Sequence, residues 1–559
     1  MRSRGCDPAP VLPESRWRSA STPARRCCSI RNPNSASPEA AVREQRDFDV
    51  IVVGSGVGGG ATALRLASSG LSIALVERGT FLPREAENWD ADEVFRRQRY
   101  QSPDERWSFD GGKPIKPASY YFVGGATKLF GGVMMRLRER DFQEIEYPDG
   151  LSPAWPIGYQ DLEPYYGQAE RLFGVHGHPG VDPTEPPQTS QLPFGAVDHD
   201  RPIEQLIYQL RDRSLRPFSL PLVLQRHSGG ACVRCGTCDG YPCLVGAKLD
   251  AELALVRPAI AHRNVTLLDN SMVTRLELDP ASNKISRIVG LRNGQEFSLR
   301  AEVFVVSAGA INSAALLLHS AGGRSPRGLA NSSGVVGRHY MAHNSSVVMA
   351  VGLKKTGTVF QKSFGVNDFY FGDEHYPHPM GNVQMIGKLH GPMLAHRTPM
   401  LPPRLRQAVA DRSVDWYLQS EDLPHPDSRV SVGADGSIRL DRKVTNLRSH
   451  KELVKRIRGL MRSLGYPLVL SEMLGARTTS HQCGTVRMGS DPKQAALDAF
   501  CRTYDHPNLF VVDGSFFPSS AAVNPSLTIA AQALRVADHM LAEDFGIGND
   551  RSRESIVSI

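Results

Sequence analysis

The sequence predicts an α/β fold whose first domain is Rossmann-like and binds a dinucleotide. An apolar, β-branched run over 48–53 is followed by a glycine-rich turn over 54–60. A helix-forming stretch over 61–69 then leads into a second apolar run over 71–76. This succession of strand, turn, helix and strand is typical of a parallel sheet. With 41% hydrophobic and 22% charged residues, the 559-residue chain has a globular composition, which excludes a wholly disordered or collagen-like protein.

Most of the net charge lies in the first 46 residues. The formal net charge is +7, and residues 1–46 contribute +5 because nine Arg outnumber four acidic residues there. This segment is rich in Arg, Ser, Pro and Ala and lacks apolar periodicity, so we expect a disordered basic tail, with a transit peptide as the alternative. The body over 47–559 carries only +2, so we expect no nucleic-acid partner.

No apolar run has the length and continuity of a membrane span. The longest candidate, Val303–Ala321, is interrupted by polar residues and is better explained as a buried strand, a turn and a helix. No apolar segment of the secretory type follows the N-terminal charges. We therefore expect no transmembrane segment and a soluble protein, with a cytoplasmic location favoured over export.

The glycine-rich turn carries the pattern G-x-G-x-x-G at Gly54, Gly56 and Gly59. The first glycine permits the tight turn, the second lets the backbone approach a pyrophosphate, and the third allows close packing of helix and strand. The N-terminus of the following helix favours an anion. Glu77, at the end of the second strand, is placed to bind a ribose, which disfavours a 2′-phosphate but does not separate NAD from FAD.

A second group of motifs lies near the C-terminus. His481 opens the run HQCGTVRMG, and the apolar run Leu509–Val512 ends in an Asp-Gly turn pair at 513–514. Asn524 is a good N-cap and Pro525 suits a first helical turn, so we expect a helix from there to about residue 542. The N-terminus of that helix is a second site that favours negative charge.

Together these stretches resemble the glucose–methanol–choline (GMC) family of FAD-dependent oxidoreductases. The run YFVGGATKLFGG at 121–132 is similar to the first signature of the family. The run WPIGYQDLEPYY at 155–166 is similar to the segment that follows it in the gluconate-dehydrogenase-like and pyranose-oxidising branch, and SAGAINS at 307–313 to the return to the nucleotide domain. The resemblance extends from about residue 47 to about residue 538.

The resemblance implies which residues contact FAD. Because residues 120–135 contain no His that could form a covalent link, we expect the cofactor to be bound non-covalently. The implied contacts are Gly54, Gly56 and Gly59 with the diphosphate, Glu77 with the adenosine ribose, Gly124, Gly125 and Thr127 with the diphosphate and flavin, Val273 with the adenine, Asp513 and Gly514 with the ribityl chain and ring, and Asn524, Pro525 and Ser526 with the pyrimidine end.

The resemblance also implies that His481 and Asn524 form a pair over the flavin N5. Oxidation of an alcohol requires removal of the hydroxyl proton and delivery of a hydride from the same carbon. A histidine, with an ordinary pKa of about 6.5, suits the base, whereas an asparagine can hold the oxygen but cannot take the proton. We therefore predict an FAD-dependent dehydrogenase or oxidase that acts on the CH–OH group of an alcohol, polyol or sugar, with His481 as the base.

Two other functions stay open from the sequence. The first is an FAD-bound lyase of the same fold, and the second is an electron-transfer protein that combines a flavin with a cysteine cluster. The sequence does not identify the small-molecule alcohol. It also does not decide whether oxygen, a quinone or a cytochrome accepts the electrons.

Four cysteines, Cys232, Cys235, Cys238 and Cys243, lie within 12 residues. Some gluconate- and glucose-dehydrogenase relatives carry a Cys-rich insertion here, which in some of them holds an iron–sulfur cluster. Four thiolates are also a zinc ligand set, and two disulfides would form in an oxidising compartment. We expect disulfide-bonded or free thiols, with an iron–sulfur cluster and then zinc as the alternatives.

The family form implies two interleaved domains. The predicted FAD-binding domain comprises residues 47–150, 225–335 and 477–545. The predicted substrate domain, built on an antiparallel sheet with helices, comprises residues 151–224 and 336–476. Residues 546–559 form a C-terminal tail in this prediction.

Overall fold

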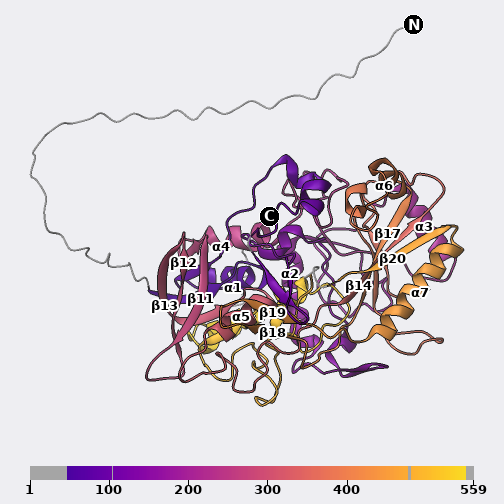
Figure 1. Cartoon of the computed structure of the whole chain (residues 1–559). Coiled ribbons are helices and arrows are strands. Elements are labelled where there is room, and N and C mark those ends of the chain that lie inside the picture. The colour runs from indigo at the N-terminus through magenta and orange to yellow at the C-terminus, as the bar shows by residue number, and fades with distance from the viewer. Residues whose placement is uncertain (1–46, 104, 476–479, 549–559) are drawn as a thin grey trace, which may run out of the picture. The chain divides into compact units, whose positions relative to one another are not determined.

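Two β-sheets carry most of the regular structure (Figure 1). The computed structural model describes residues 47–103, 105–475 and 480–548. The predicted basic tail over 1–46 and most of the predicted C-terminal tail, over 549–559, lie outside the described residues.

The first sheet has seven strands, and its centre is parallel. β1 (Asp47–Val53) lies between β2 (Ile73–Val76) and the second half of β13 (Gln295–Val306), and both neighbours run parallel to it. The residues of β1 from Val50 to Val53 are almost fully buried, as expected for a strand covered on both faces. The remaining strands are β10 (Val265–Leu268) beside β2, β21 (Leu509–Val511) beside the end of β13, and the antiparallel pair β12 (Ile285–Arg292) and β11 (Ser271–Leu278) beside the start of β13.

Helices of this part of the chain follow or precede the parallel strands. α1 (Val57–Ala67) packs against α8 (Ser526–Glu543), which in turn packs against α2 (Tyr159–Phe173). α5 (Ala310–His319) follows β13 after a short turn. The predicted strand, turn and helix within 303–321 are therefore confirmed, and so is the α/β fold class with a Rossmann-like strand–turn–helix start.

The second sheet has six antiparallel strands. Its order is β20 (Leu468–Met473), β14 (Asn344–Val351), β17 (Ser413–Ser420), β16 (Asn382–Met385), β15 (Phe364–Val366) and β8 (Phe218–Ser219).

One face of this second sheet is apolar and the other is polar. Val348, Trp416 and Leu418 pack with the apolar stripes of α3 (Arg201–Arg211) and α7 (Leu447–Ser463). Because side chains alternate along a strand, Tyr417 and Gln419 point to the opposite face. That polar face contributes the walls of the candidate site.

Smaller elements join the two sheets. β3 (Trp107–Phe109), which comes from the predicted FAD-binding segment, pairs with β19 (Ile438–Asp441), which comes from the predicted substrate segment. The strands of each large sheet come only from the segments predicted for one domain, yet the exact boundaries stay a prediction. The remaining strands and α-helices are β4 (Lys113–Ile115), β5 (Ile145–Tyr147), β6 (Gly150–Ser152), β7 (Val175–His176), β9 (Leu222–Val223), β18 (Arg429–Val432), α4 (Arg257–Ile260) and α6 (Pro403–Ala410).

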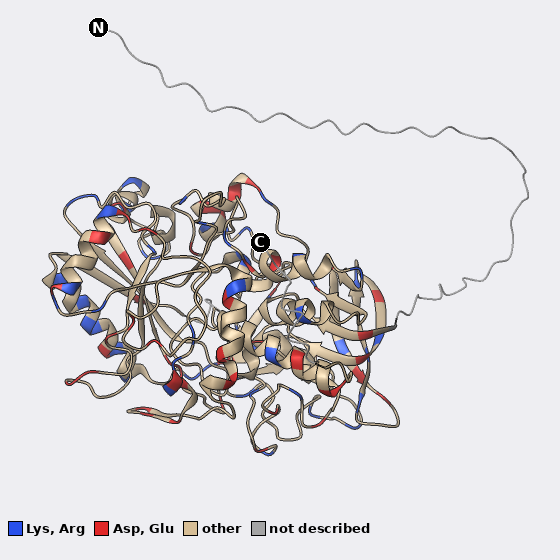
Figure 2. Ribbon diagram, turned by 180° about the vertical axis from the view of Figure 1, so that it is seen from behind, with Lys and Arg blue, Asp and Glu red and all other residues tan. Residues whose placement is uncertain are grey.

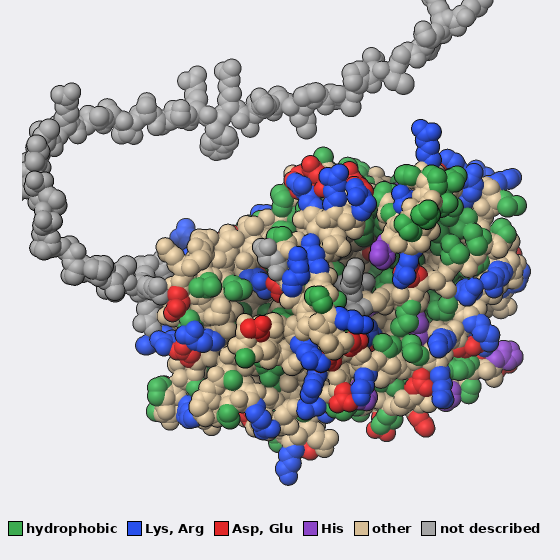
Figure 3. Space-filling view, viewed as in Figure 1, with side chains coloured by type: hydrophobic (Ala, Val, Ile, Leu, Met, Phe, Trp, Pro, Cys, Tyr) green, Lys and Arg blue, Asp and Glu red, His purple; other side chains and the backbone are tan. Residues whose placement is uncertain are grey.

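The surface carries charges of both signs, spread over most elements (Figure 2). Exposed apolar side chains, among them Met400, Leu405 and Leu470, gather over α6 and the edge strand β20 (Figure 3). An ion pair between Arg397 and Glu472 lies at this edge, where charges discourage pairing with another strand. Among the described helices, none combines the length and the apolar composition that a membrane span requires.

Candidate active site

A cavity of about 910 Å³ lies where the carboxyl ends of β1, β2 and β13 meet the polar face of the second sheet. This volume is at the upper end of the range of about 300–1,000 Å³ that is usual for small-molecule and cofactor sites. In open α/β sheets, ligands bind outside the carboxyl ends of the strands. The residues singled out from the sequence that line this cavity are Gly54, Gly56, Glu77, Gly125, Thr127, Val273, His481, Asp513, Gly514, Asn524, Pro525 and Ser526.

Gly54, Gly56 and Gly59 have three different environments. Gly54 has a φ of +101°, and a Cβ there would come within 2.2 Å of the Ser307 carbonyl oxygen. Gly59 does not line the cavity, and a Cβ on it would lie 1.9 Å from the Gly54 carbonyl oxygen. A Cβ on Gly56 would meet nothing within 4 Å, because this residue faces the open cavity at the start of α1. The turn thus leaves room for a phosphate group at Gly56 and at the N-terminus of α1.

The carboxylate of Glu77 is tied into the same turn. It accepts hydrogen bonds from the Ser55 amide at 3.0 Å, the Ser55 hydroxyl at 2.7 Å and the Gly79 amide at 3.0 Å. Burial raises the pKa of Glu77, and these three donors act in the opposite direction. Glu77 therefore both fixes the glycine-rich turn and faces the cavity beside it.

Gly124 and Gly125 form a second backbone turn at the cavity, with φ values of +95° and +61°. Gly125 lies against Gly56, since a Cβ on it would be 3.0 Å from the Gly56 Cα. Gly124 does not line the cavity and packs against the amide of Glu252. The Thr127 hydroxyl donates to the Gly124 carbonyl at 2.6 Å, so its first role is to hold this turn.

Asp513 joins the end of β21 to the start of α5. Its carboxylate accepts from the Gly309 amide at 2.9 Å, from the Ser515 amide at 2.8 Å and from the Ser313 hydroxyl. Burial raises its pKa, while these donors lower it. The side chain of Asp513 thus shapes the cavity wall, and the backbone of Gly514 lines that wall beside it.

These observations fit a bound FAD. The lining offers glycine backbone, a helix N-terminus and an open space at Gly56, which are the features that a dinucleotide diphosphate requires. Val273, on β11, lines the same cavity together with its neighbours Met272 and Thr274. The residues that would hold FAD are therefore assembled around one continuous space.

His481 and Asn524 meet at the wall of the cavity. The amide nitrogen of Asn524 lies 3.4 Å from Nε2 of His481, and Oδ1 of Asn524 has no hydrogen-bond partner within the described residues. The predicted helix N-cap role of Asn524 is wrong, because α8 begins at Ser526 with Pro525 as its N-cap, and Oδ1 of Asn524 accepts no hydrogen bond from the described residues. Its side chain is turned to His481 instead. His481 has a φ of +57°, a left-handed conformation that costs about 1–3 kcal/mol and is found at functional sites.

Two residues behind His481 had no distinguishing signal in the sequence. Nδ1 of His343 lies 3.0 Å from Nδ1 of His481, and the side-chain amide of Gln419 lies 3.0 Å from both of these nitrogens. Nε2 of His343 lies 3.0 Å from the carbonyl oxygen of Ser520. His343 is one of 17 His and precedes an ordinary apolar strand, so only the tertiary structure selects it.

The hydrogen bonds assign the proton position of His343 and restrict the partners of His481. A carbonyl oxygen only accepts, so Nε2 of His343 carries a proton for Ser520 and Nδ1 of a neutral His343 is an acceptor. Nδ1 of His481 faces both this acceptor and the side-chain amide of Gln419, which is a donor, so its hydrogen bonds permit either tautomer of His481. In the tautomer with the proton on Nδ1, toward His343, Nε2 of His481 is unprotonated and faces the amide of Asn524.

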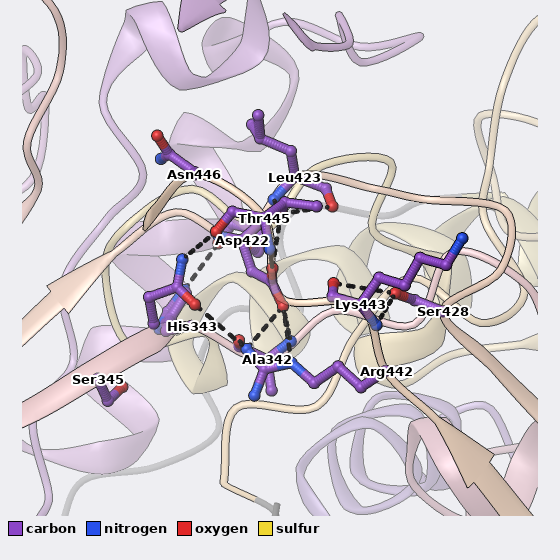
Figure 4. A network of polar contacts seen from close by, with 12 residues as sticks. Ala342, His343, Ser345, Asp422, Leu423, Ser428, Arg442, Lys443, Thr445 and Asn446 are labelled. Carbon is purple, nitrogen blue, oxygen red and sulfur yellow. Dashed lines mark hydrogen bonds and ion pairs between the residues drawn. The ribbon is translucent and has the colours of Figure 1, made fainter. Parts of the chain in front are cut away.

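His343 is held by a buried ion pair under the neighbouring backbone. Figure 4 shows Ala342 between Asp422 and Arg442. The Asp422 carboxylate accepts from the Ala342 amide at 3.2 Å and from Arg442 at 2.8 Å, while Arg442 donates to the Ala342 carbonyl. Both backbone polar groups of the residue before His343 are therefore fixed, which limits the movement of its ring.

Both histidines are neutral at neutral pH. Burial lowers the pKa of His481 well below its ordinary value of 6.5, and the neighbouring His343 and Lys362 lower it further. Burial also lowers the pKa of His343 to about 4. A neutral His481 with an unprotonated Nε2 at a cavity wall can accept a proton from a bound hydroxyl.

The cysteine-rich loop is organised by a lysine. The Lys248 ammonium donates to the carbonyl oxygens of Phe130, Cys238 and Tyr241 at 2.6–2.8 Å. The four cysteines of the cluster, Cys232, Cys235, Cys238 and Cys243, are free thiols.

Cys238 is partly buried, and loss of solvent around its thiol raises the pKa to about 12. Within the described residues no three Cys, His, Asp or Glu side chains form a metal-ligating group, so neither the iron–sulfur nor the zinc interpretation of this loop has support.

Comparisons with known proteins agree with this architecture. Models of the GMC oxidoreductase family match residues 117–345 and 470–533, and an FAD binding domain model matches residues 49–83. The chain is 31% identical over 527 residues to paromamine 6'-oxidase from Streptomyces fradiae, which covers 88% of this chain and 91% of the relative.

Two further comparisons extend over nearly the whole chain. The chain is 27% identical over 561 residues to the fructose dehydrogenase large subunit from Gluconobacter japonicus, with 89% and 98% of the two chains covered. The crystal structure of pyridoxine 4-oxidase from Mesorbium loti superposes with a TM-score of 0.60 at 19% identity, over 88% of this chain and 99% of that one, which shows a shared fold.

Alanine substitutions at Gly56 and Gly59 should separate cofactor binding from folding. A Cβ on Gly59 meets backbone at 1.9 Å, so Gly59→Ala should lower the melting temperature of the FAD-free protein. Gly56→Ala has free space and an ordinary φ of −67°, so the FAD-free protein should melt as the unmodified one does, while its affinity for FAD falls at least tenfold. Thermal melts and FAD titrations measure both effects. Unchanged FAD affinity in folded Gly56→Ala protein would contradict this assignment.

Proposed function

This chain belongs to the GMC oxidoreductase family, and we propose that it oxidises the CH–OH group of a small-molecule alcohol, polyol or sugar with non-covalently bound FAD. The observation that carries the proposal is the buried imidazole of His481, whose pKa is lowered and whose Nε2 faces Asn524 at the wall of the cavity. The names of the relatives, a paromamine 6'-oxidase and a fructose dehydrogenase, support this class of reaction.

His481 and Asn524 divide the work on the substrate hydroxyl. The Asn524 amide donates a hydrogen bond to the hydroxyl oxygen and fixes its position. Nε2 of His481 accepts the hydroxyl proton, which it can do because burial keeps the ring neutral. Bound FAD supplies the acceptor for the hydride that leaves the same carbon.

His343 stabilises the product of the proton transfer. Once Nε2 of His481 has taken the proton, the ring is a cation, and its Nδ1–H donates to Nδ1 of His343. His343 can accept because its own proton stays on Nε2, bound to the Ser520 carbonyl. No proton has to leave His481 by this route, so His343 is a positioning residue and not a second base.

Non-covalent attachment of FAD is supported by the composition of the cavity wall. Among the described residues that line the cavity there is no Cys, and the two histidines are His319 and His481. His481 is engaged with His343 and Asn524.

The activity can be tested by anaerobic mixing with a panel of alcohols. We expect bleaching of the oxidised flavin absorbance with at least one alcohol, and readmission of air then reports whether oxygen is an acceptor. His481→Ala should slow the bleaching by about 10²–10⁴-fold, because general-base catalysis contributes that much. His375→Ala, at an exposed position, is the control and should leave the rate unchanged. A protein that stays colourless after reconstitution with FAD would overturn the proposal.

The pH dependence follows from the lowered pKa of His481. The base must be unprotonated, so the rate of flavin reduction should be full above this pKa and fall as the pH decreases through it. Because burial places the pKa well below 6.5, we expect a constant rate from pH 8 to 6.5 and a decline only at lower pH. Stopped-flow measurements across this range provide the test. A half-maximal rate at pH 6.5 or above would be inconsistent with a buried, neutral base.

Substitutions at His343 should separate the hydrogen bond from mere packing. His343→Leu removes the acceptor for the His481 proton and should lower the limiting rate of flavin reduction by about 10–100-fold, with little change in substrate affinity. His343→Asn restores an acceptor near the position of Nδ1 and should recover much of the rate. Equal loss in both variants would indicate a packing role alone.

A further inference from the structure

A buried ion pair lines the cavity and takes no part in the proton transfer. The Lys362 ammonium lies 2.6 Å from Oδ2 of Asp239, and the two side chains are 5% and 18% exposed. Burial alone would raise the pKa of Asp239, but Lys362 and the amide of Gly387, which donates at 3.1 Å, bring it below its ordinary value. Asp239 is therefore ionised at neutral pH.

The ion pair lies beside the loop that resembles the first family signature. A Cβ on Gly131 would come within 1.9 Å of the Lys362 nitrogen and 2.4 Å of Oδ1 of Asp239. Gly131 itself lines the cavity, in the run that the family resemblance assigns to the flavin. The charged atoms thus lie against the backbone of the run that would line the flavin, where a substrate must also bind.

Gln384 adds a third polar group to the same cavity. It lies on β16, in register with Tyr417 of β17, and its amide nitrogen donates to Oε1 of Gln419 at 3.0 Å. This hydrogen bond fixes the amide, and Oε1 of Gln384 is buried with no partner among the described residues. Buried acceptors are normally satisfied, so an unpartnered one at a cavity wall indicates a ligand group.

All three groups have unused hydrogen-bonding capacity. The Lys362 ammonium has three donors, and the described residues use only one of them, for Asp239. Oδ2 of Asp239 accepts from Lys362 and Gly387, whereas its Oδ1 accepts no hydrogen bond from the described chain. Donors and acceptors are therefore offered together, which is the arrangement that a hydroxyl group satisfies because it both donates and accepts.

We propose that Lys362, Asp239 and Gln384 recognise hydroxyl groups of a polyhydroxylated substrate, a sugar or polyol, next to the CH–OH group that is oxidised. This inference rests on the proposed function and adds the substrate class to it. A monohydroxy alcohol would displace water from these groups and return no hydrogen bond. Sites built to bind a hydroxyl reject analogues that lack it by about 10⁴-fold or more.

The ion pair also connects the cysteine-rich loop to the segment before β15. A test must therefore distinguish recognition of the substrate by Lys362 and Asp239 from their structural support of this loop. The chain contains a matched pair for this purpose. Lys388 and Asp415 lie 3.3 Å apart, their side chains are 8% and 0% exposed, and neither lines the cavity. Removing both charges of this second pair removes a comparable buried interaction without touching the substrate.

The experiment measures flavin reduction in the FAD-loaded enzyme with matched substrates. D-sorbitol is compared with 1-hexanol, myo-inositol with cyclohexanol, and D-glucose with tetrahydropyran-2-methanol. In the unmodified enzyme we expect at least one polyol to exceed its monohydroxy match by about 100-fold or more in the ratio of reduction rate to dissociation constant. The double variant Lys362→Met with Asp239→Asn keeps the volume, carries no unpaired charge, and should lose most of that preference.

The control variant, Lys388→Met with Asp415→Asn, should keep the preference for the polyol. Equal loss of preference in both double variants, or its full retention in the Lys362 and Asp239 variant, would overturn the inference. So would unmodified enzyme that reduces its flavin equally well with both members of every pair, although the proposed oxidation would then stand. Bleaching by neither class would overturn the proposed oxidation, and this inference with it.

Discussion

The site depends on the hydrogen bond between the Ser520 carbonyl and Nε2 of His343. This acceptor fixes the proton of His343 on Nε2, so Nδ1 of His343 is an acceptor that faces Nδ1 of His481. Without the Ser520 carbonyl, the proton of His343 could shift to Nδ1. Nδ1 of His343 would then be a donor toward His481 and could no longer accept the proton on Nδ1 of His481. A neutral imidazole has two tautomers, and only one of them is a base toward the cavity. The acceptor that favours the basic tautomer of His481 is therefore held by backbone geometry at Ser520, which does not itself line the cavity.

The two sheets contribute different kinds of groups to the cavity. The seven-stranded sheet supplies turns at strand ends, where glycine backbone and a helix N-terminus suit a phosphate-bearing cofactor. The six-stranded sheet supplies side chains from its polar face, of which Gln384 and Tyr417 line the cavity. His481 and Asn524 lie where these regions meet. Because the cofactor contacts depend on backbone shape, they can stay the same in proteins of this fold that act on different substrates. The substrate contacts depend on side chains, so substitutions there can change which substrate is bound.

The sequence predicts the cofactor side better than the substrate side, for a physical reason. Gly54 and Gly59 respond to local backbone constraints, a positive φ and a close approach, and these leave a pattern that can be read directly. His481 and Asn524 are found only through the family resemblance, and local reasoning about Asn524 as a helix cap is wrong. His343, together with Lys362, Asp239 and Gln384, acquires its partners from strands and loops distant in the chain. No local pattern marks such residues, because their role exists only after folding.

The cysteine-rich loop stands out in the sequence for its four cysteines, but its contribution to the cavity is the carboxylate of Asp239. The cysteines are free thiols, and it is the backbone of the loop that is held by Lys248, whose ammonium binds the carbonyls of Cys238 and Tyr241 as well as that of Phe130. A buried ammonium needs such acceptors, so the loop must follow a defined path around it. That path carries Asp239 to Lys362 and to the surface of the cavity. The loop therefore acts on the substrate side through one carboxylate that its backbone positions, and its sulfur atoms need no metal for this role.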